Sequence, residues 1–111
     1  MANVSSVKEY FDNIESRFHA DASKGVNAIF QFELSGEGGG VYAVSVDDGK
    51  VAVKNGPVDA PTVTLKMDAE DYVKMSNGKI NGHWAVMSGK LKVSGNMMVA
   101  MKMQQIFPPG K

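Results

Sequence analysis

The spacing of apolar residues changes its period several times along the chain. Between residues 5 and 19 the apolar positions recur every three or four residues, which predicts an amphipathic helix. The apolar arc of this helix is formed by Val7, Tyr10, Phe11, Ile14 and Phe18. Ser6 and Glu9 have the spacing of a capping box, so we expect the helix to begin next to them.

A period of two follows and predicts four successive strands, each with apolar side chains in phase on one face. The four segments are residues 26–34, 41–46, 51–53 and 62–67. Asp48-Gly49, between the second and third segments, is a strong signal for a two-residue hairpin turn. Residues 55–61 contain a glycine and two prolines and are expected to form a loop.

The C-terminal part of the chain returns to helical spacing. Asp68 is expected to cap a helix that stops at Asn77-Gly78, and a shorter helix is expected to end at Gly89. Leu91 and Val93 then alternate with polar residues in a fifth strand, before a last helix capped by Asn96.

Because the strands cluster in the sequence, the pattern predicts an α+β fold with a five-stranded, largely antiparallel sheet covered by helices. At 111 residues, the chain is expected to form a single domain over residues 1–111.

The last helix is expected to have two apolar faces. One face carries Val99, Met103 and Ile106. The other carries Met97, Ala100, Met101, Gln104 and Phe107, which leaves Met98, Lys102 and Gln105 for solvent. An ordinary surface helix has one apolar stripe, so this helix needs a second apolar wall or an apolar ligand. Methionine adapts to partners of different shape, although a Met-rich helix is more often part of the core than a binding site.

Charge and composition narrow the functional classes. The formal net charge is zero, which does not favour binding to nucleic acid. No cysteine is present, which excludes disulfides and thiolate chemistry. Met1 to Ala20 is too polar for a signal peptide and no stretch has the length of a membrane span, so a cytoplasmic location is expected.

Residues that could carry out catalysis are few. His19 and His83 lack metal-ligand spacing, and the carboxylates at positions 68, 70 and 71 are explained by helix capping. The glycines at positions 36–40 do not match a phosphate-binding loop. We therefore expect no enzyme activity, no cofactor and no metal. Lys79, Lys90 and Lys92, with Lys102, form a mild basic cluster that is either a solvated face or a contact for a membrane or an acyl phosphate.

The run from Gly78 to Ile106 resembles the carboxyl-terminal half of the sterol carrier protein 2 family, the non-specific lipid-transfer proteins. The matching residues are Gly78, Lys79, Asn81, Ala85, Gly89, Lys90, Leu91, Lys92, Gly95, Asn96, Ala100, Lys102 and Gln104. Upstream, the likeness continues in Phe32 to Gly36, in Asp48-Gly49 and in the run T-L-K-M-D-A-E-D-Y. Gly82 departs from the family, which often has proline there, and Pro109-Gly110-Lys111 is not a peroxisomal targeting tripeptide.

The resemblance implies an apolar tunnel for a fatty acid, a fatty acyl-CoA or a sterol, and a carrier that performs no catalysis. It also implies that Gln104 is a polar residue of the tunnel, where a polar group usually fixes the orientation of a ligand. We expect the tunnel to be lined by Phe30, Phe32, Tyr72, Met75, Trp84, Met87, Met97, Met101 and Gln104.

An alternative from another class is a protein-interaction or homodimerisation module that uses the same Met-rich surface. The expected partners are thus a lipid or fatty acyl ligand and no nucleic acid. A transient membrane contact and the oligomeric state are both left open.

Overall fold

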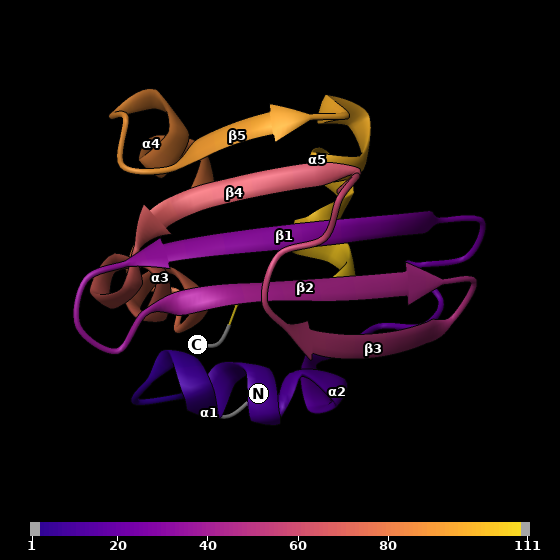
Figure 1. The fold of residues 1–111 in the computed structure, drawn as a ribbon, viewed down its shortest axis with the longest axis horizontal. Coiled ribbons are helices and arrows are strands. Elements are labelled where there is room, and N and C mark those ends of the chain that lie inside the picture. Colours follow the sequence, from indigo (N-terminus) through magenta and orange to yellow (C-terminus); the bar gives the residue numbers. More distant parts are fainter. Residues whose placement is uncertain (1–2, 110–111) are drawn as a thin grey trace.

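The computed structural model describes residues 3–109 and contains ten elements (Figure 1). In chain order they are α1 (Val7–Asp12), α2 (Ile14–Arg17), β1 (Asn27–Ser35), β2 (Gly40–Asp47), β3 (Lys50–Asn55), β4 (Val63–Asp68), α3 (Ala69–Ser76), α4 (Gly82–Met87), β5 (Lys92–Gly95) and α5 (Met97–Ile106). Gly110 and Lys111, which belong to the C-terminal tripeptide discussed above, lie outside the described residues.

The five strands form one sheet in the order β3-β2-β1-β4-β5. Three of the four neighbouring pairs are antiparallel, and β1 runs parallel to β4. The predicted α+β fold with a largely antiparallel five-stranded sheet is therefore confirmed. The β2–β3 hairpin turns at Asp48 and Gly49, whose φ angles of 43° and 93° are those that a tight turn of this kind requires.

The parallel pair arises because residues 56–62 cross one face of the sheet. This segment carries the chain from β3, at one edge, to β4 beside β1, and Figure 1 shows it passing in front of β2 and β1. Its hydrogen bonds to the sheet include those from the Val58 amide to Gln31 Oε1 and from the Ile29 amide to Thr62 Oγ1, each 2.9 Å long. The helices cover the opposite face.

The core lies between that opposite face and the helices. The side chains of β1 that alternate toward the helices, Phe30 and Phe32 among them, are fully buried. Phe32 meets Phe11 of α1 and Tyr72 of α3 edge-on, with ring centroids 5.2 Å and 5.5 Å apart. Edge-to-face aromatic pairs add stability beyond the area that they bury, so this cluster fixes α1 and α3 on the sheet.

The first predicted helix is broken into two. Asn13, with φ −114° and ψ 19°, separates α1 from α2, and its side-chain nitrogen donates to the Glu9 carbonyl at 2.9 Å. Side chains of this type compete with the backbone for its hydrogen bonds, so Asn13 interrupts the helix although the apolar spacing continues. The capping box also forms in part: Ser6 accepts from the Glu9 amide, whereas the Glu9 carboxylate accepts from the Ser5 amide.

Asn77 connects the N-terminal segment to the end of α3. Its side-chain oxygen accepts from the Val4 amide and its side-chain nitrogen donates to the Val4 carbonyl, both at 2.8 Å. The two bonds are buried, and losing such bonds is more costly than losing exposed ones. No helix among the described residues is long and apolar enough to cross a membrane.

Candidate functional site

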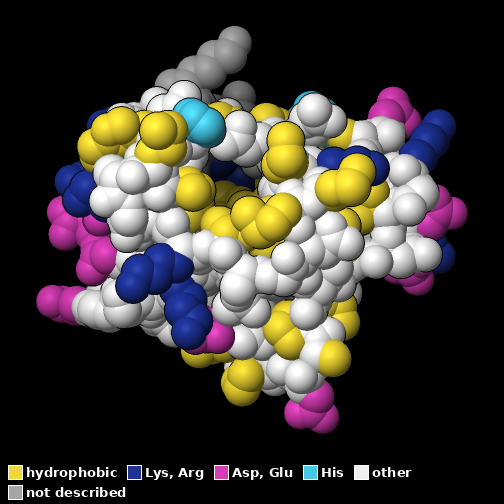
Figure 2. All heavy atoms as spheres, turned by 90° about the horizontal axis from the view of Figure 1, so that it is seen from above, with side chains coloured by type: hydrophobic (Ala, Val, Ile, Leu, Met, Phe, Trp, Pro, Cys, Tyr) yellow, Lys and Arg dark blue, Asp and Glu magenta, His cyan; other side chains and the backbone are white. Residues whose placement is uncertain are grey.

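A pocket opens between the C-terminal end of α3, the beginning of α4 and the last turns of α5. It has a volume of about 190 Å³. Its lining is formed by Tyr10, Arg17, Tyr72, Met75, Ser76, Gly78, Ile80, Asn81, Gly82, Met103, Gln104, Phe107 and Pro109. Figure 2 looks down on the β5 edge of the sheet and shows a hollow with apolar side chains gathered around it.

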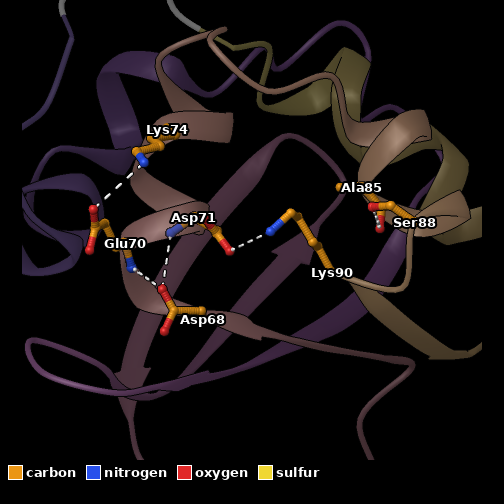
Figure 3. A network of polar contacts seen from close by, with 7 residues as sticks. All are labelled: Asp68, Glu70, Asp71, Lys74, Ala85, Ser88 and Lys90. Carbon is orange, nitrogen blue, oxygen red and sulfur yellow. Dashed lines mark hydrogen bonds and ion pairs between the residues drawn. The ribbon is translucent and has the colours of Figure 1, made fainter.

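Two helices, α3 and α5, contribute to the pocket through residues at a helical repeat. Tyr72 and Met75, three residues apart on α3, form one wall, and Met103 and Phe107, four residues apart, form the wall opposite. The α3 side is fixed because Asp68 caps the helix by accepting from the amides of Glu70 and Asp71 at 3.0 Å and 3.3 Å (Figure 3). The apolar walls suit a hydrocarbon ligand.

The inner part of the pocket contains a buried guanidinium. Arg17 is 2% exposed; its Nη1 donates to the Ser76 carbonyl at 2.8 Å, and its guanidinium carbon lies 5.0 Å from the centre of the Tyr10 ring. A cation over an aromatic face is stabilised by the ring quadrupole. Arg17 was not among the predicted site residues, although its spacing of three residues from Ile14 places it on the buried arc of the first helical segment.

Gln104 lies at the entrance of the pocket, opposite the start of α4. The absence of a side chain at Gly82 provides the room for it, because a Cβ there would overlap with Gln104 Nε2. Asn81 begins α4 by accepting from the amides of His83 and Trp84 at 2.8 Å and 3.2 Å. The departure from proline at position 82 therefore leaves the helix start intact and makes space for the Gln104 amide.

The loop after α4 is tied to α3. Lys90 Nζ lies 3.7 Å from an Asp71 carboxylate oxygen, and Ser88 Oγ donates to the Ala85 carbonyl at 3.2 Å (Figure 3). The Lys90–Asp71 pair is partly exposed, so it contributes little to stability. It does connect the loop after α4 to α3.

A second, larger hollow has different chemistry. It is an open groove of about 490 Å³, and its lining includes Glu33, Lys66, Asp68, Lys90 and Lys92. Lys66 and Glu33 approach each other to 3.7 Å within it. A groove with charged walls of both signs does not suit an apolar ligand, so we take the smaller pocket as the candidate site.

The residues predicted to line the tunnel fall into three groups. Tyr72, Met75 and Gln104 line the pocket. Phe30 and Phe32 are in the core beneath the helices and are not among the lining residues. The remaining four are exposed on α4 and α5: Trp84 (50%), Met87 (74%), Met97 (51%) and Met101 (76%).

The solvent-facing side of the last helix is wider than predicted. Met103 and Ile106 are buried, as expected for the first face, and so is Phe107. On the second face, however, Met97 and Met101 are exposed, together with Gln104, so the prediction that three residues alone face solvent is wrong. The helix packs through one side only.

Two buried tyrosines of the pocket, Tyr10 and Tyr72, have shifted pKa values. Burial raises the pKa of Tyr10, and it raises the pKa of Tyr72 well above its usual value. Both phenols are therefore neutral over the physiological range and can act as hydrogen-bond donors. Within residues 3–109, no group of three or more His, Cys, Asp or Glu side chains could hold a metal ion.

Comparison with known proteins agrees with this architecture. Hydroxysteroid dehydrogenase-like protein 2 of Bos taurus is 37% identical over 107 residues, which make up 96% of this chain and 26% of the relative. The chain thus spans about a quarter of the length of the curated relatives that it matches.

Two solved structures have the same fold. The solution structure of palmitated SCP2L2 from Aedes aegypti matches with a TM-score of 0.72 and 24% identity, covering 96% of this chain and 97% of that one. A double mutant of the sec-alkyl sulfatase PisA1, an enzyme of Pseudomonas sp., matches with a TM-score of 0.82 and 15% identity, covering 96% and 17% of the two chains.

The sequence model that describes the SCP-2 sterol transfer family matches residues 8–108 of this chain. The match covers all the helices and strands described above, except for the first residue of α1. The chain belongs to the SCP-2 sterol transfer family.

Proposed function

We propose that this domain binds one lipid, a fatty acid, a fatty acyl-CoA or a sterol, in the pocket between α3, α4 and α5, and carries it without chemical change. The observation that carries the proposal is a pocket with apolar walls from Tyr72, Met75 and Met103 beside a polar inner part around Arg17. Such a combination of apolar and polar surfaces suits the two ends of an amphiphile. Burying each methylene group contributes about 0.8 kcal/mol, so an acyl chain can bind tightly by burial alone.

The pocket must widen to accept such a ligand. Its volume of about 190 Å³ is below the roughly 300–1,000 Å³ of ordinary ligand pockets. We propose that α4 moves, because Ala85 is the one buried residue among its six, so little apolar surface would be uncovered. Phe32 lies directly behind Tyr72, with ring centroids 5.5 Å apart, and a deeper pocket would reach it and then Phe30.

The exposed residues that were predicted to line the tunnel have a role at its entrance in this proposal. Trp84 and Met87 on α4, and Met97 and Met101 on α5, stand on the two helices that border the hollow. We propose that they contact the ligand as it enters. The palmitated state of the Aedes aegypti structure supports an acyl ligand.

The test is the uptake of a fluorescent fatty acid by a pocket variant. Met75→Glu places a carboxylate in the apolar wall, and a charge without a partner is strongly disfavoured beside a hydrocarbon chain. We expect affinity to fall by about tenfold or more. Val53→Glu makes the same type of change on β3, at the far edge of the sheet, and should leave affinity unchanged. Equal affinity in a folded Met75→Glu variant would reject the pocket.

A further inference from the structure

Six exposed apolar side chains gather on the two helices at the pocket entrance. We call them the α4–α5 patch: Trp84, Val86, Met87, Met97, Met98 and Met101. The three most exposed are Met87, Met98 and Met101, each about three-quarters accessible to solvent. Single exposed apolar residues are ordinary on protein surfaces, whereas a group of this kind marks an interaction site. Figure 2 shows apolar side chains on both sides of the hollow.

Charge is distributed very unevenly along the chain, although the net charge is zero. All twelve Asp and Glu residues fall within residues 1–71, together with six Lys and Arg residues, which gives that segment a formal charge of −6. Residues 72–111 carry six lysines and no acidic residue, a formal charge of +6. The C-terminal segment that contains the α4–α5 patch is therefore strongly basic.

The lysines of this segment differ in their surroundings. Lys74 pairs with Glu70 at 3.6 Å and Lys90 pairs with Asp71 at 3.7 Å, so these acidic residues offset part of the charge beside α3. Lys92 lies on β5, the edge strand, and Lys102 lies on α5 between Met101 and Met103, where both are exposed. Lys92 also lines the charged groove with Glu33 and Lys66, so Lys102 is the lysine that lies on a helix of the patch itself.

We propose that the α4–α5 patch docks on an anionic lipid bilayer and places the pocket entrance against it. Tryptophan and methionine suit the boundary between headgroups and acyl chains, and lysines beside them are attracted to anionic headgroups. Gly82 and Gln104, at the entrance, belong to the same two helices, so a lipid could pass into the pocket without crossing water. This proposal rests on the proposed lipid-binding function.

The positive charge of the C-terminal segment argues against a second copy of the chain as the partner of the α4–α5 patch. Two copies that met through the same patch would bring two basic segments together, which is repulsive at short range. A fluid, anionic surface satisfies both the apolar side chains and the lysines, because it supplies hydrocarbon and negative charge in adjacent layers.

Trp84, the sole tryptophan of the chain, serves as a built-in probe. The full chain is mixed with vesicles of phosphatidylcholine, alone or with an equal part of phosphatidylserine. We expect a blue shift of Trp84 emission and co-sedimentation with the anionic vesicles, both lost in about 1 M salt, which screens exposed charges beyond about 3 Å. Lys102→Glu should weaken binding to the anionic vesicles by about tenfold. Met98→Glu, at the most exposed turn of α5, should do the same.

Matched controls lie elsewhere on the molecule. Lys24→Glu makes the same change of net charge in the loop after α2, and Val53→Glu adds a carboxylate at an exposed apolar residue of β3. Both should bind the vesicles like the unmodified protein. Equal losses in Lys24→Glu and Lys102→Glu would overturn the proposal, since binding would then depend on overall charge alone.

Uptake of a fluorescent fatty acid by the unmodified protein, measured without vesicles, separates the two proposals. Patch-dependent vesicle binding without uptake would refute the lipid-carrier function and leave the docking surface in place. Uptake without patch-dependent vesicle binding would overturn the docking surface alone. A mass in light scattering that rises with concentration, and that Met98→Glu abolishes, would assign the patch to a second copy instead.

Discussion

Tyr72 connects the core of this domain to its pocket. Its ring contacts those of Tyr10 and Phe32 edge-on, with centroids 5.1 Å and 5.5 Å away, and it is also part of the pocket wall. Its position could be predicted from the sequence as an apolar residue on α3. Its burial beside Arg17 could not, because that guanidinium comes from a helix 55 positions earlier in the chain.

The raised pKa of Tyr72 makes stability depend on alkaline pH. Burial holds the phenol neutral in the folded protein, whereas the unfolded chain releases the proton near pH 10, the usual value. Above that pH the unfolded state binds fewer protons than the folded state, so the free energy of unfolding falls as pH rises, by at most about 1.4 kcal/mol per pH unit for one group. Urea unfolding at increasing alkaline pH should show a shallower fall in Tyr72→Phe. An identical fall in both proteins would exclude this origin.

At the scale of the element, α4 and α5 are attached to the domain to different degrees. Ala85 is the buried residue of α4, whereas α5 is anchored by Met103, Ile106 and the hydrogen bond from the His19 amide to the Ile106 carbonyl at 2.8 Å. The sequence predicted both helices, α4 from the short segment that ends at Gly89 and α5 from its apolar spacing and the Asn96 cap, whereas the Asn81 cap was found only in the structure. Periodicity could not tell which of two apolar faces of α5 meets the sheet, since a helical wheel contains no information about neighbours.

The caps of these two helices provide a matched pair of variants. Removing an N-cap side chain costs about 0.5–2 kcal/mol. Asn81→Ala should accelerate hydrogen exchange of the α4 amides and leave the melting temperature nearly unchanged, because α4 can open locally. Asn96→Ala, which loses the bond from the Val99 amide, should lower the melting temperature. Similar changes of melting temperature in both variants would show that α4 is part of the cooperative core.

The break between α1 and α2 shows where the apolar pattern is insufficient. Its spacing continues through Ile14, so a single helix over residues 5–19 was the natural prediction. The break comes from one polar side chain, Asn13, and from Ser16 Oγ, which donates to the Asn13 carbonyl at 2.7 Å. A polar side chain that competes for backbone hydrogen bonds leaves the spacing of the apolar residues unchanged, so this spacing alone does not predict such a break.

At the scale of the whole molecule, the alternation of apolar and polar residues predicts which segments form strands and where the hairpin turns lie. The order of the strands in the sheet depends on long-range contacts instead. The parallel pairing of β1 and β4 needs residues 56–62 to cross the sheet, and Val58 and Thr62 secure that crossing through Gln31 and Ile29. The pocket likewise collects residues from five helices. The sequence predicted Tyr72, Met75 and Gln104 as site residues, from separate segments of the chain. No local sequence pattern predicts that they lie beside Tyr10 and Arg17.

The central claim is that this domain carries a lipid, and native mass spectrometry of the purified protein beside its organic extract tests it most directly. We expect a discrete additional mass that corresponds to an acyl lipid or a sterol found in the extract. A clean mass of the bare chain, from a protein that also fails to take up a fluorescent fatty acid, would contradict it.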